Sequence, residues 1–236
     1  MNTISPWRLL GLLLMIVAGV VAWAFHRGDL RIKDRWNPWA GLHIEDAPNL
    51  FTSFKLAQLS RDPLLCQQVL AGARMLYTPL ADRETGPGCG FSNAVRIRAT
   101  SAAIGADFSL SCRAAVSLAM WEKHTLQVAA HAEYAQHVER IEHAGSYACR
   151  DVRGSGVGRR SRHATADAID IAGFVLADGR RIRVLSDWSG DDRDSRFLRA
   201  LHAGGCRYFD TALGPDYNAA HRDHLHLDRG SFSLCR

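Results

Sequence analysis

A long apolar run near the N-terminus is suited to lipid, whereas the rest of the chain is suited to water. All 17 residues of Leu9–Phe25 are apolar or glycine. As a helix rising about 1.5 Å per residue, the run spans about 25 Å, at the short end of what crosses a bilayer. Arg8 precedes the run and His26 follows it. The sequence therefore predicts one membrane segment followed by a globular domain that folds outside the lipid.

We favour an uncleaved anchor over a cleaved signal peptide. Ala22-Trp23-Ala24 has the small residues of a cleavage site, but the apolar core is long for a signal peptide and Phe25-His26-Arg27 is a poor continuation. The positive-inside rule alone would keep the domain in the cytoplasm, because basic residues follow the run at Arg27, Arg31, Lys33 and Arg35. The cysteines and the family resemblance below outweigh that rule. We expect a single-pass protein of the inner membrane with its C-terminal domain in the periplasm.

The remaining sequence is typical of one globular domain. Hydrophobic residues make up 47% of the chain and charged residues 22%, so a core of ordinary size is available. The formal net charge is +5, but the basic residues are scattered without a nucleic-acid-binding motif, so we expect no nucleic-acid partner. Mixed charges and two prolines predict a juxtamembrane linker over residues 26–50. This linker joins the membrane segment (residues 1–25) to the domain (residues 51–236). The sequence does not indicate an oligomeric state.

The cysteines indicate an oxidising compartment. There are six, and none forms a CxxC pair: Cys66, Cys89, Cys112, Cys149, Cys206 and Cys235. An even number of widely spaced cysteines behind an export segment predicts three disulfides, whereas six reduced cysteines in a cytosolic protein is the alternative. Six cysteines allow 15 pairings, and spacing does not choose among them. We expect Cys206 to pair with Cys235, which would hold the C-terminal tail beside the site.

Local patterns predict an α+β domain. Asp62-Pro63 supplies a helix cap and a first-turn proline, and Ser111 caps a second apolar helix. Asp178-Gly179 is a hairpin turn between two strand patterns. We predict helices over residues 63–70, 111–121 and 195–202, and strands over residues 94–97, 138–141, 168–171, 181–185 and 224–227. Because helices cluster early and strands late, we expect a small antiparallel sheet that carries the site and is flanked by helices, besides the N-terminal transmembrane helix.

Histidines are concentrated near the C-terminus, at His221, His224 and His226. On a strand, His224 and His226 project to the same face because side chains alternate. Two imidazoles on one face are a natural start for a zinc site. The alternative is a surface cluster without a metal.

A second pattern supplies further ligands. In the run from Ser161 to Asp170, His163 follows a loop rich in glycine and arginine, and Asp170 lies between two isoleucines of a predicted strand. A carboxylate in such an apolar strand needs a compensating partner. A divalent metal would provide it; bonds to arginine or backbone groups are the alternative.

This run resembles the SxHxxGxAxD motif of LAS-type zinc peptidases, which include carboxypeptidases and murein endopeptidases. The resemblance implies that His163, Asp170 and His226 bind Zn²⁺. The sequence departs from the motif at Ala166, where that group usually has glycine.

More of the chain resembles the bacterial extensin-like C-terminal domain family. The likeness covers roughly residues 34–236 and is carried by four segments: 145–150 (GSYACR), 163–174 (HATADAIDIAGF), 213–218 (LGPDYN) and the final Cys235-Arg236.

The LAS resemblance also implies roles around the metal. The general base is His224 or Asp223, and we prefer His224 because on a strand it shares the face of His226. Arg150 falls where the peptidases place an arginine that stabilises the substrate oxyanion. We expect the substrate to be bordered by His221, Ser161, Trp188 and Tyr217, with Ser161 shaping the loop rather than acting as a nucleophile.

These features predict a zinc-dependent hydrolase that cleaves amide bonds in peptidoglycan stem peptides or cross-links. The sequence leaves open D,D or L,D specificity, and endo or exo cleavage. A non-catalytic, zinc-containing cell-wall-binding or scaffolding module is one alternative. A metal-storage patch of histidines is another.

Overall fold

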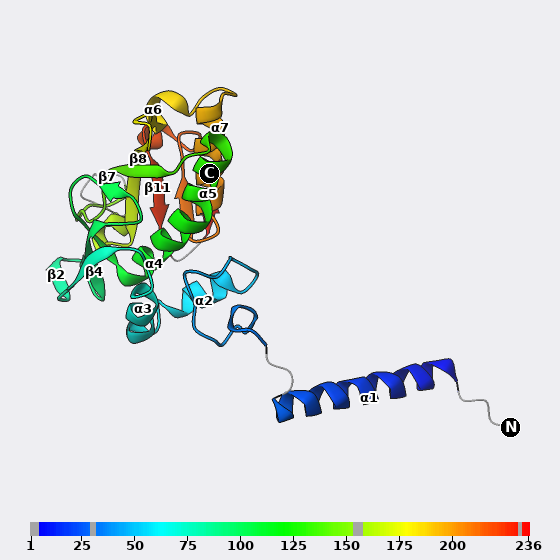
Figure 1. Cartoon of the computed structure of the whole chain (residues 1–236). Helices are drawn as coiled ribbons and strands as arrows, with labels where there is room; N and C mark the ends of the chain where they lie inside the picture. Colours follow the sequence, from blue (N-terminus) through cyan, green and yellow to red (C-terminus); the bar gives the residue numbers. More distant parts are fainter. Residues whose placement is uncertain (1–4, 29–31, 153–157, 231–232) are drawn as a thin grey trace.

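The computed structural model describes residues 5–28, 32–152, 158–230 and 233–236. The N-terminal apolar run forms helix α1 (Pro6–Arg27), and none of its residues is buried (Figure 1). Proline at its first position and Gly28 at φ 78° after its end are typical helix boundaries. The helix is long and apolar enough to cross a membrane, either as an anchor or as a signal sequence.

The other elements form one domain. Its helices and helical turns are η1 (Asp34–Trp36), α2 (Thr52–Gln58), α3 (Pro63–Leu70), α4 (Cys112–Trp121), the π-helical turn η2 (Glu122–Leu126), α5 (Gln127–Tyr134), η3 (Arg162–Thr165), α6 (Val184–Asp187), α7 (Arg193–Gly205) and η4 (Ala219–His221). Its strands are β1 (Leu76–Leu80), β2 (Arg83–Gly86), β3 (Cys89–Phe91), β4 (Ala94–Ala99), β5 (Ala103–Ile104), β6 (Phe108–Ser111), β7 (Val138–Gly145), β8 (Ala168–Leu176), β9 (Arg181–Arg183), β10 (Thr211–Leu213), β11 (Leu225–Asp228) and β12 (Leu234–Cys235).

A seven-stranded sheet organises the domain, in the order β12-β10-β11-β8-β7-β5 with β9 also paired to β8. Its central strands are antiparallel, and the outer pairs β10–β12 and β5–β7 are parallel. Ile169 and Leu227 pair across β8 and β11 and both are buried in the core. Because side chains alternate along a strand, the next pair, Asp170 and His226, projects from the opposite face.

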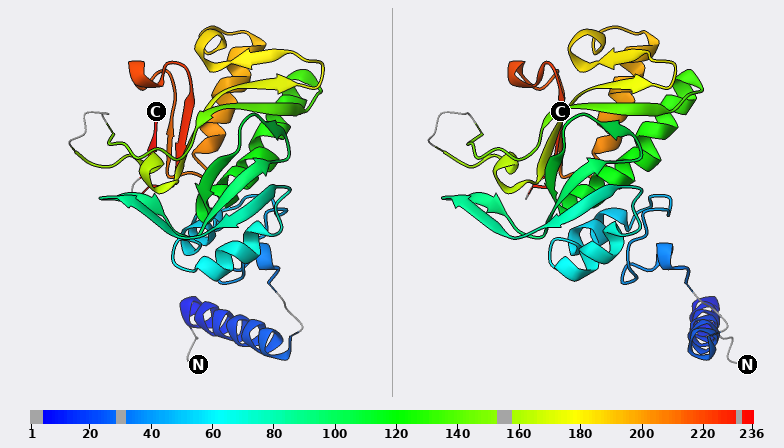
Figure 2. Two further views of the ribbon diagram at one scale, coloured as in Figure 1. Left: turned by 90° about the vertical axis from the view of Figure 1, so that its left-hand side faces the viewer. Right: turned by 60° about the vertical axis from the view of Figure 1, so that its left-hand side comes forward.

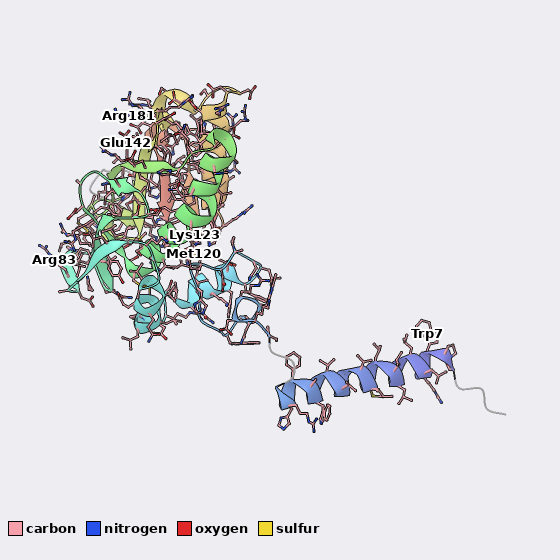
Figure 3. All side chains as sticks on the ribbon, in the orientation of Figure 1. Trp7, Arg83, Met120, Lys123, Glu142 and Arg181 are labelled. Carbon is pink, nitrogen blue, oxygen red and sulfur yellow. A yellow bond between two sulfur atoms is a disulfide. The ribbon has the colours of Figure 1, made fainter. Side chains whose placement is uncertain are left out.

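Helices α4, α5 and α7 cover the core face of this sheet (Figure 2). Trp121 is fully buried at the end of α4, and its indole nitrogen donates to the carbonyl of Leu201 on α7 at 3.0 Å. Its ring lies 6.3 Å from that of Phe174 on β8. At the solvent-facing end of the sheet, Arg181 of β9 pairs with Glu142 of β7 at 2.9 Å (Figure 3). The helices therefore cover one face of the central strands, and Asp170 and His226 project from the other face (Figure 2).

Smaller sheets and three disulfides complete the domain. Strands β1, β4 and β6 form a three-stranded antiparallel sheet, and β2 and β3 form a hairpin. The disulfides are Cys66–Cys112, Cys89–Cys149 and Cys206–Cys235. The number of disulfides and the expected Cys206–Cys235 pair are confirmed. Each one ties segments far apart in the sequence, which stabilises the fold by restricting the unfolded chain.

The α+β class and the apolar N-terminal helix are confirmed, and so are several local signals. Asp62 caps α3 and Ser111 caps α4, each by accepting a backbone hydrogen bond. The hairpin at Asp178-Gly179 joins β8 to β9, with Gly179 at φ 85°. Three details differ from the prediction. The end of the 181–185 pattern turns into α6, α7 begins two residues earlier at the Asp192 cap, and six short strands precede α4 instead of an all-helical early region.

The segment expected to be a linker is packed against the domain. Leu42 and Ile44 are 7% and 5% exposed and belong to the hydrophobic core. The buried Lys55 ammonium donates to the carbonyl of Asp34 at 2.7 Å, which ties α2 to η1. We call residues 32–58 the membrane-proximal segment.

Candidate metal centre

Three side chains from two strands and a turn meet on the face of the sheet opposite helices α4, α5 and α7. Asp170 and His226 are register partners on β8 and β11, and His226 Nδ1 lies 2.8 Å from Asp170 Oδ1. His163, on the turn η3, places its Nε2 3.2 Å from Asp170 Oδ2 and 3.2 Å from His226 Nδ1. All three residues are buried, and one ligand atom from each lies within 4.8 Å of the others. The structure thus brings together the three ligands predicted from the sequence.

The outer nitrogen of each histidine is also held. His163 Nδ1 hydrogen-bonds to the carbonyl oxygen of Ser146, so its Nε2 faces the cluster. His226 Nε2 lies 3.0 Å from Asp228 Oδ2, so its Nδ1 faces the cluster. Such partners orient metal-binding histidines and set their tautomers. Sequence reasoning missed both: Asp228 was detectable as the residue two after His226 on the same strand face, whereas the Ser146 contact comes from the backbone and carries no sequence signal.

The cluster has the electrostatics of a cation site. Burial acts to raise the pKa of Asp170, but hydrogen bonds and charges from His163 and His226 outweigh it and hold this pKa well below its usual range. Burial lowers the pKa of His226, but Asp170 and Asp228 outweigh it and raise this pKa to about 9. In both cases a positive charge beside the carboxylates is favoured. Two nitrogens and a carboxylate are suitable zinc ligands, so a bound ion would take the place of the proton shared among these groups.

The turn that carries His163 is constrained at both ends. Ser161 caps it, and its hydroxyl accepts a hydrogen bond from the His163 amide at 3.3 Å, in agreement with a loop-shaping role. Ala166 follows the turn with φ 54°, a left-handed conformation that glycine adopts without strain. Ala166 adopts this conformation although it carries a Cβ. Asp167 then precedes β8, and its carboxylate accepts hydrogen bonds from Ser111, Arg113 and Thr165.

His224, Asp223 and Arg150 lie at the edge of the cluster. His224 precedes β11, not within it as predicted, and its Nε2 is 3.5 Å from Asp170 Oδ1. Its Nδ1 is 2.9 Å from Asp223 Oδ1, and the Asp223 side chain is half exposed. An Arg150 amino group lies 3.8 Å from Asp170 Oδ2. Asp223 is thus placed to orient His224, while His224 points its other nitrogen at the cluster.

The remaining predicted site residues separate into two groups. The His221 ring lies 5.3 Å from that of His224 and 5.4 Å from that of Tyr217, which is exposed. Burial, together with the charges of His226 and His224, lowers the pKa of His221 to about 4, so it is neutral at neutral pH. Trp188, in contrast, is buried edge-to-face against His202 of α7, and within the described residues no contact joins it to the cluster. Such burial is usual for a large aromatic side chain.

A cavity of about 810 Å³ lies on the Asp167 side of the same turn. It is bounded by the β2–β3 hairpin, the start of α3 and α4, and the flanks of η3, including Arg113, Arg162 and Thr165. The cluster itself does not line this cavity. The side chains of Arg150 and Tyr217 near the cluster are exposed, whereas His163, Asp170 and His226 are buried.

The fold and the cluster define a disulfide-bonded α+β domain with a candidate metal centre on the open face of its main sheet. The family model of the extensin-like protein C-terminus matches residues 64–236, and the chain belongs to this family. A comparison with curated proteins found no match.

Proposed function

We propose that the protein is a zinc-dependent hydrolase that cleaves amide bonds in peptidoglycan stem peptides or cross-links. The observation that carries the proposal is the convergence of His163, Asp170 and His226, with one ligand atom from each within 4.8 Å of the others. The donor set fits Zn²⁺, which takes three protein ligands in catalytic sites. The hydrogen bond from His226 to Asp228 also fits a bound zinc, because a metal-binding histidine commonly donates its other ring N–H to a carboxylate.

His224 is the proposed general base. A bound zinc supplies a Lewis acid and a water molecule whose pKa is lowered to about 7. His224 Nε2 faces the cluster and accepts a proton from the attacking water, while Asp223 holds its Nδ1 at 2.9 Å. With zinc bound, the water oxygen would bond to the amide carbon as the C–N bond breaks, and His224 would return the proton to the leaving amine. Asp223 is the alternative base, but its half-exposed position beside His224 favours an orienting role.

Arg150 is the proposed stabiliser of the developing negative charge on the carbonyl oxygen. Its guanidinium lies 3.8 Å from Asp170 and is 46% exposed, so it can meet a substrate that enters from solvent. Preorganised donors of this kind contribute on the order of 3 kcal/mol to transition-state stabilisation. Exposed Tyr217 and the neighbouring His221 border the same entrance and are proposed to contact the substrate.

The substrate class rests on resemblance and location. The ligand spacing resembles that of LAS-type peptidases of the cell wall, and three disulfides suit a domain in the periplasm. We propose that α1 is a single-pass anchor in the inner membrane, with the domain on the periplasmic side. Labelling of an introduced cysteine by a membrane-impermeant maleimide in intact spheroplasts tests this orientation. A label that enters only after lysis contradicts it.

The first test is metal content. Full-length protein purified in detergent is expected to hold about one zinc per chain by mass spectrometry, as one three-ligand site requires. The double variant His163→Ala/His226→Ala is expected to hold none. His131→Ala is the matched control, because His131 is an exposed histidine on α5. Absence of zinc from wild-type protein that is folded and fully disulfide-bonded would overturn the metal-centre proposal.

The second test separates binding from turnover. His224→Ala is expected to keep its zinc and to lose about 10²- to 10⁴-fold in cleavage of defined muropeptides, the usual contribution of a general base. Loss of zinc in this variant would show that His224 is a ligand. If wild-type protein holds zinc and binds muropeptides but leaves them intact, the non-catalytic wall-binding alternative replaces the hydrolase.

A further inference from the structure

The membrane-proximal segment is a fixed part of the domain. Besides the buried Leu42 and Ile44, it is joined to the domain by polar contacts: the Ile44 carbonyl lies 2.8 Å from His124 Nε2, and Glu45 forms an ion pair with Lys123. Figure 3 places Lys123 at the end of the domain where this segment docks. Figures 1 and 2 both show the segment between α1 and the sheets. Any surface that this segment contacts therefore sets the position of the whole domain.

The segment is internally braced as well. Asn49 Nδ2 donates to the carbonyl of Arg35 at 2.6 Å, and its Oδ1 accepts from the Phe51 amide at 2.8 Å. Together with the Lys55–Asp34 contact, these bonds link the first turn of the segment to α2. The outward side chains of η1 and α2 therefore belong to one rigid unit.

Those outward side chains are unusually apolar. Trp39 is 82% exposed, Leu50 72%, Phe54 49% and Trp36 44%. Phe54 is on α2 (Thr52–Gln58), and Leu50 lies in the turn two residues before the helix begins. Tryptophan with basic neighbours is characteristic of the interface between membrane and water, and Lys33 and Arg35 are those neighbours here. Exposed apolar surface of this kind marks a contact site.

The connection to α1 limits where this surface can be. Helix α1 ends at Arg27, and η1 begins seven residues later at Asp34. Even a fully extended chain of that length reaches only about 25 Å, so the segment stays close to the bilayer that α1 enters. Helix α1 itself carries Trp7 near its start (Figure 3). Trp23 lies near its end, and tryptophans at both ends of a membrane helix are usual interfacial anchors.

We infer that the apolar side chains of the membrane-proximal segment insert into the phospholipid headgroup region and hold the domain against the membrane surface in a fixed orientation. The inference rests on the proposed anchoring by α1, and it replaces a free tether with a docked domain. Trp36, Trp39, Leu50 and Phe54 supply the apolar contacts, and Lys33 and Arg35 favour anionic headgroups.

The test uses full-length protein in vesicles of phosphatidylethanolamine and phosphatidylglycerol. All six native cysteines are paired, so an introduced thiol can be labelled alone. A fluorophore at Ser53→Cys reports on the segment, and one at Leu185→Cys on α6 reports on a distant exposed position. A lipid-borne quencher is expected to reduce the emission of the probe at position 53 several-fold more than that at position 185. Trp39→Ser/Phe54→Ser is expected to remove this difference, whereas the control Leu64→Ser/Val128→Ser, outside the segment, is expected to keep it.

The alternative outcomes are distinct. If the chain floats with the vesicles but aqueous iodide quenches both probes equally, the docked-domain inference is overturned while anchoring stands. Protection of position 53 that depends on protein density and not on lipid would show that a second copy of the chain covers the surface, which also overturns the inference. A chain that does not float with the vesicles overturns the anchor and the docking together.

Discussion

Asp167 and Asp170 are buried carboxylates only three residues apart, and their surroundings differ in kind. Asp167 accepts four hydrogen bonds from groups dedicated to it: Ser111 Oγ at 2.6 Å, Arg113 Nε at 2.9 Å, Arg113 Nη2 at 2.7 Å and Thr165 Oγ1 at 2.7 Å. The closest side-chain partners of Asp170 are imidazole nitrogens, with the Arg150 guanidinium at 3.8 Å. Arginine cannot give up its charge, whereas imidazole can exchange a proton for a metal. The first environment is complete without a ligand, and the second is suited to receive one.

Glu122, on the π-helical turn, shows a third way to bury a carboxyl group. Its Oε2 accepts from the amide and hydroxyl of Ser101 at 3.1 and 2.5 Å, and no ion pair with Glu122 occurs among the described residues. Burial raises its pKa to about 7, against the opposing effect of hydrogen bonds from Ser101 and Thr100. The three groups are therefore stabilised by a fixed cation, by histidines that can bind a metal, and by protonation.

The largest expected effect is on zinc. Asp170→Asn should weaken zinc binding by more than about 100-fold, beyond the roughly 10- to 100-fold loss typical of outer-shell changes. Asp167→Asn should leave one zinc per chain, because within the described residues no hydrogen bond or ion pair joins the Asp167 side chain to His163, Asp170 or His226. Metal content and competition with a chelator measure both. If the two variants lose zinc equally, the distinction between the two carboxylates fails.

Stability without metal should reverse that order. Asp167→Ala removes the carboxylate that pairs with Arg113 at 2.7 Å and should lower the free energy of unfolding by about 3 kcal/mol. Asp170→Ala should cost only about 1 kcal/mol, because His226 can lose its proton once the carboxylate is gone. Denaturant titration in the presence of a chelator, with the disulfides intact, gives both values. A larger loss for Asp170→Ala would contradict the assignment of Asp167 as the structural group.

Glu122 should make stability depend on pH. The pKa of Glu122 is about 7 in the folded state, against 4.5 for a free glutamate side chain, so between these pH values the folded state binds more protons than the unfolded state. This contribution is complete below pH 4.5 and is lost as the pH rises to about 7, by up to about 3 kcal/mol. Glu122→Gln should remove that slope. The free energy of unfolding measured from pH 4.5 to 7.5 decides it, and an unchanged slope in the variant would show that another group is responsible.

The smallest effect concerns the support of a ligand. Asp228→Asn should lower zinc affinity by about 10- to 100-fold without abolishing binding, because the amide orients His226 less well than a carboxylate. Asp210→Asn is the matched control, since Asp210 pairs with the adjacent Arg229 at 3.4 Å and does not contact His226. Equal affinities for the wild type and Asp228→Asn would limit Asp228 to a structural role.

Much of what the sequence predicted depends on interactions within a few residues. The apolar run of α1, the caps Asp62 and Ser111, and the turn at Asp178-Gly179 encode local structure, and each appears in the fold. The shared face of His224 and His226 was readable from strand alternation, whereas the grouping of His163 and Asp170 with His226 came from the motif that this run resembles. Spacing and chemical type were sufficient for these predictions because neighbouring residues share one backbone geometry.

Only the tertiary structure decided which distant segments meet. The pairs Cys66–Cys112 and Cys89–Cys149 and the backbone support of His163 by Ser146 all depend on the packing of separate elements. The short strands before α4 carry too few residues for a clear alternation, so pairing within the sheet stabilises them more than their own propensity does. Trp188 was expected to border the substrate, and the structure packs its ring edge-to-face against His202 of α7, a contact that its sequence neighbourhood does not reveal. The segment expected to be a linker packs on the domain because Leu42 and Ile44 are buried in its core, a contact with distant residues that the local sequence does not reveal.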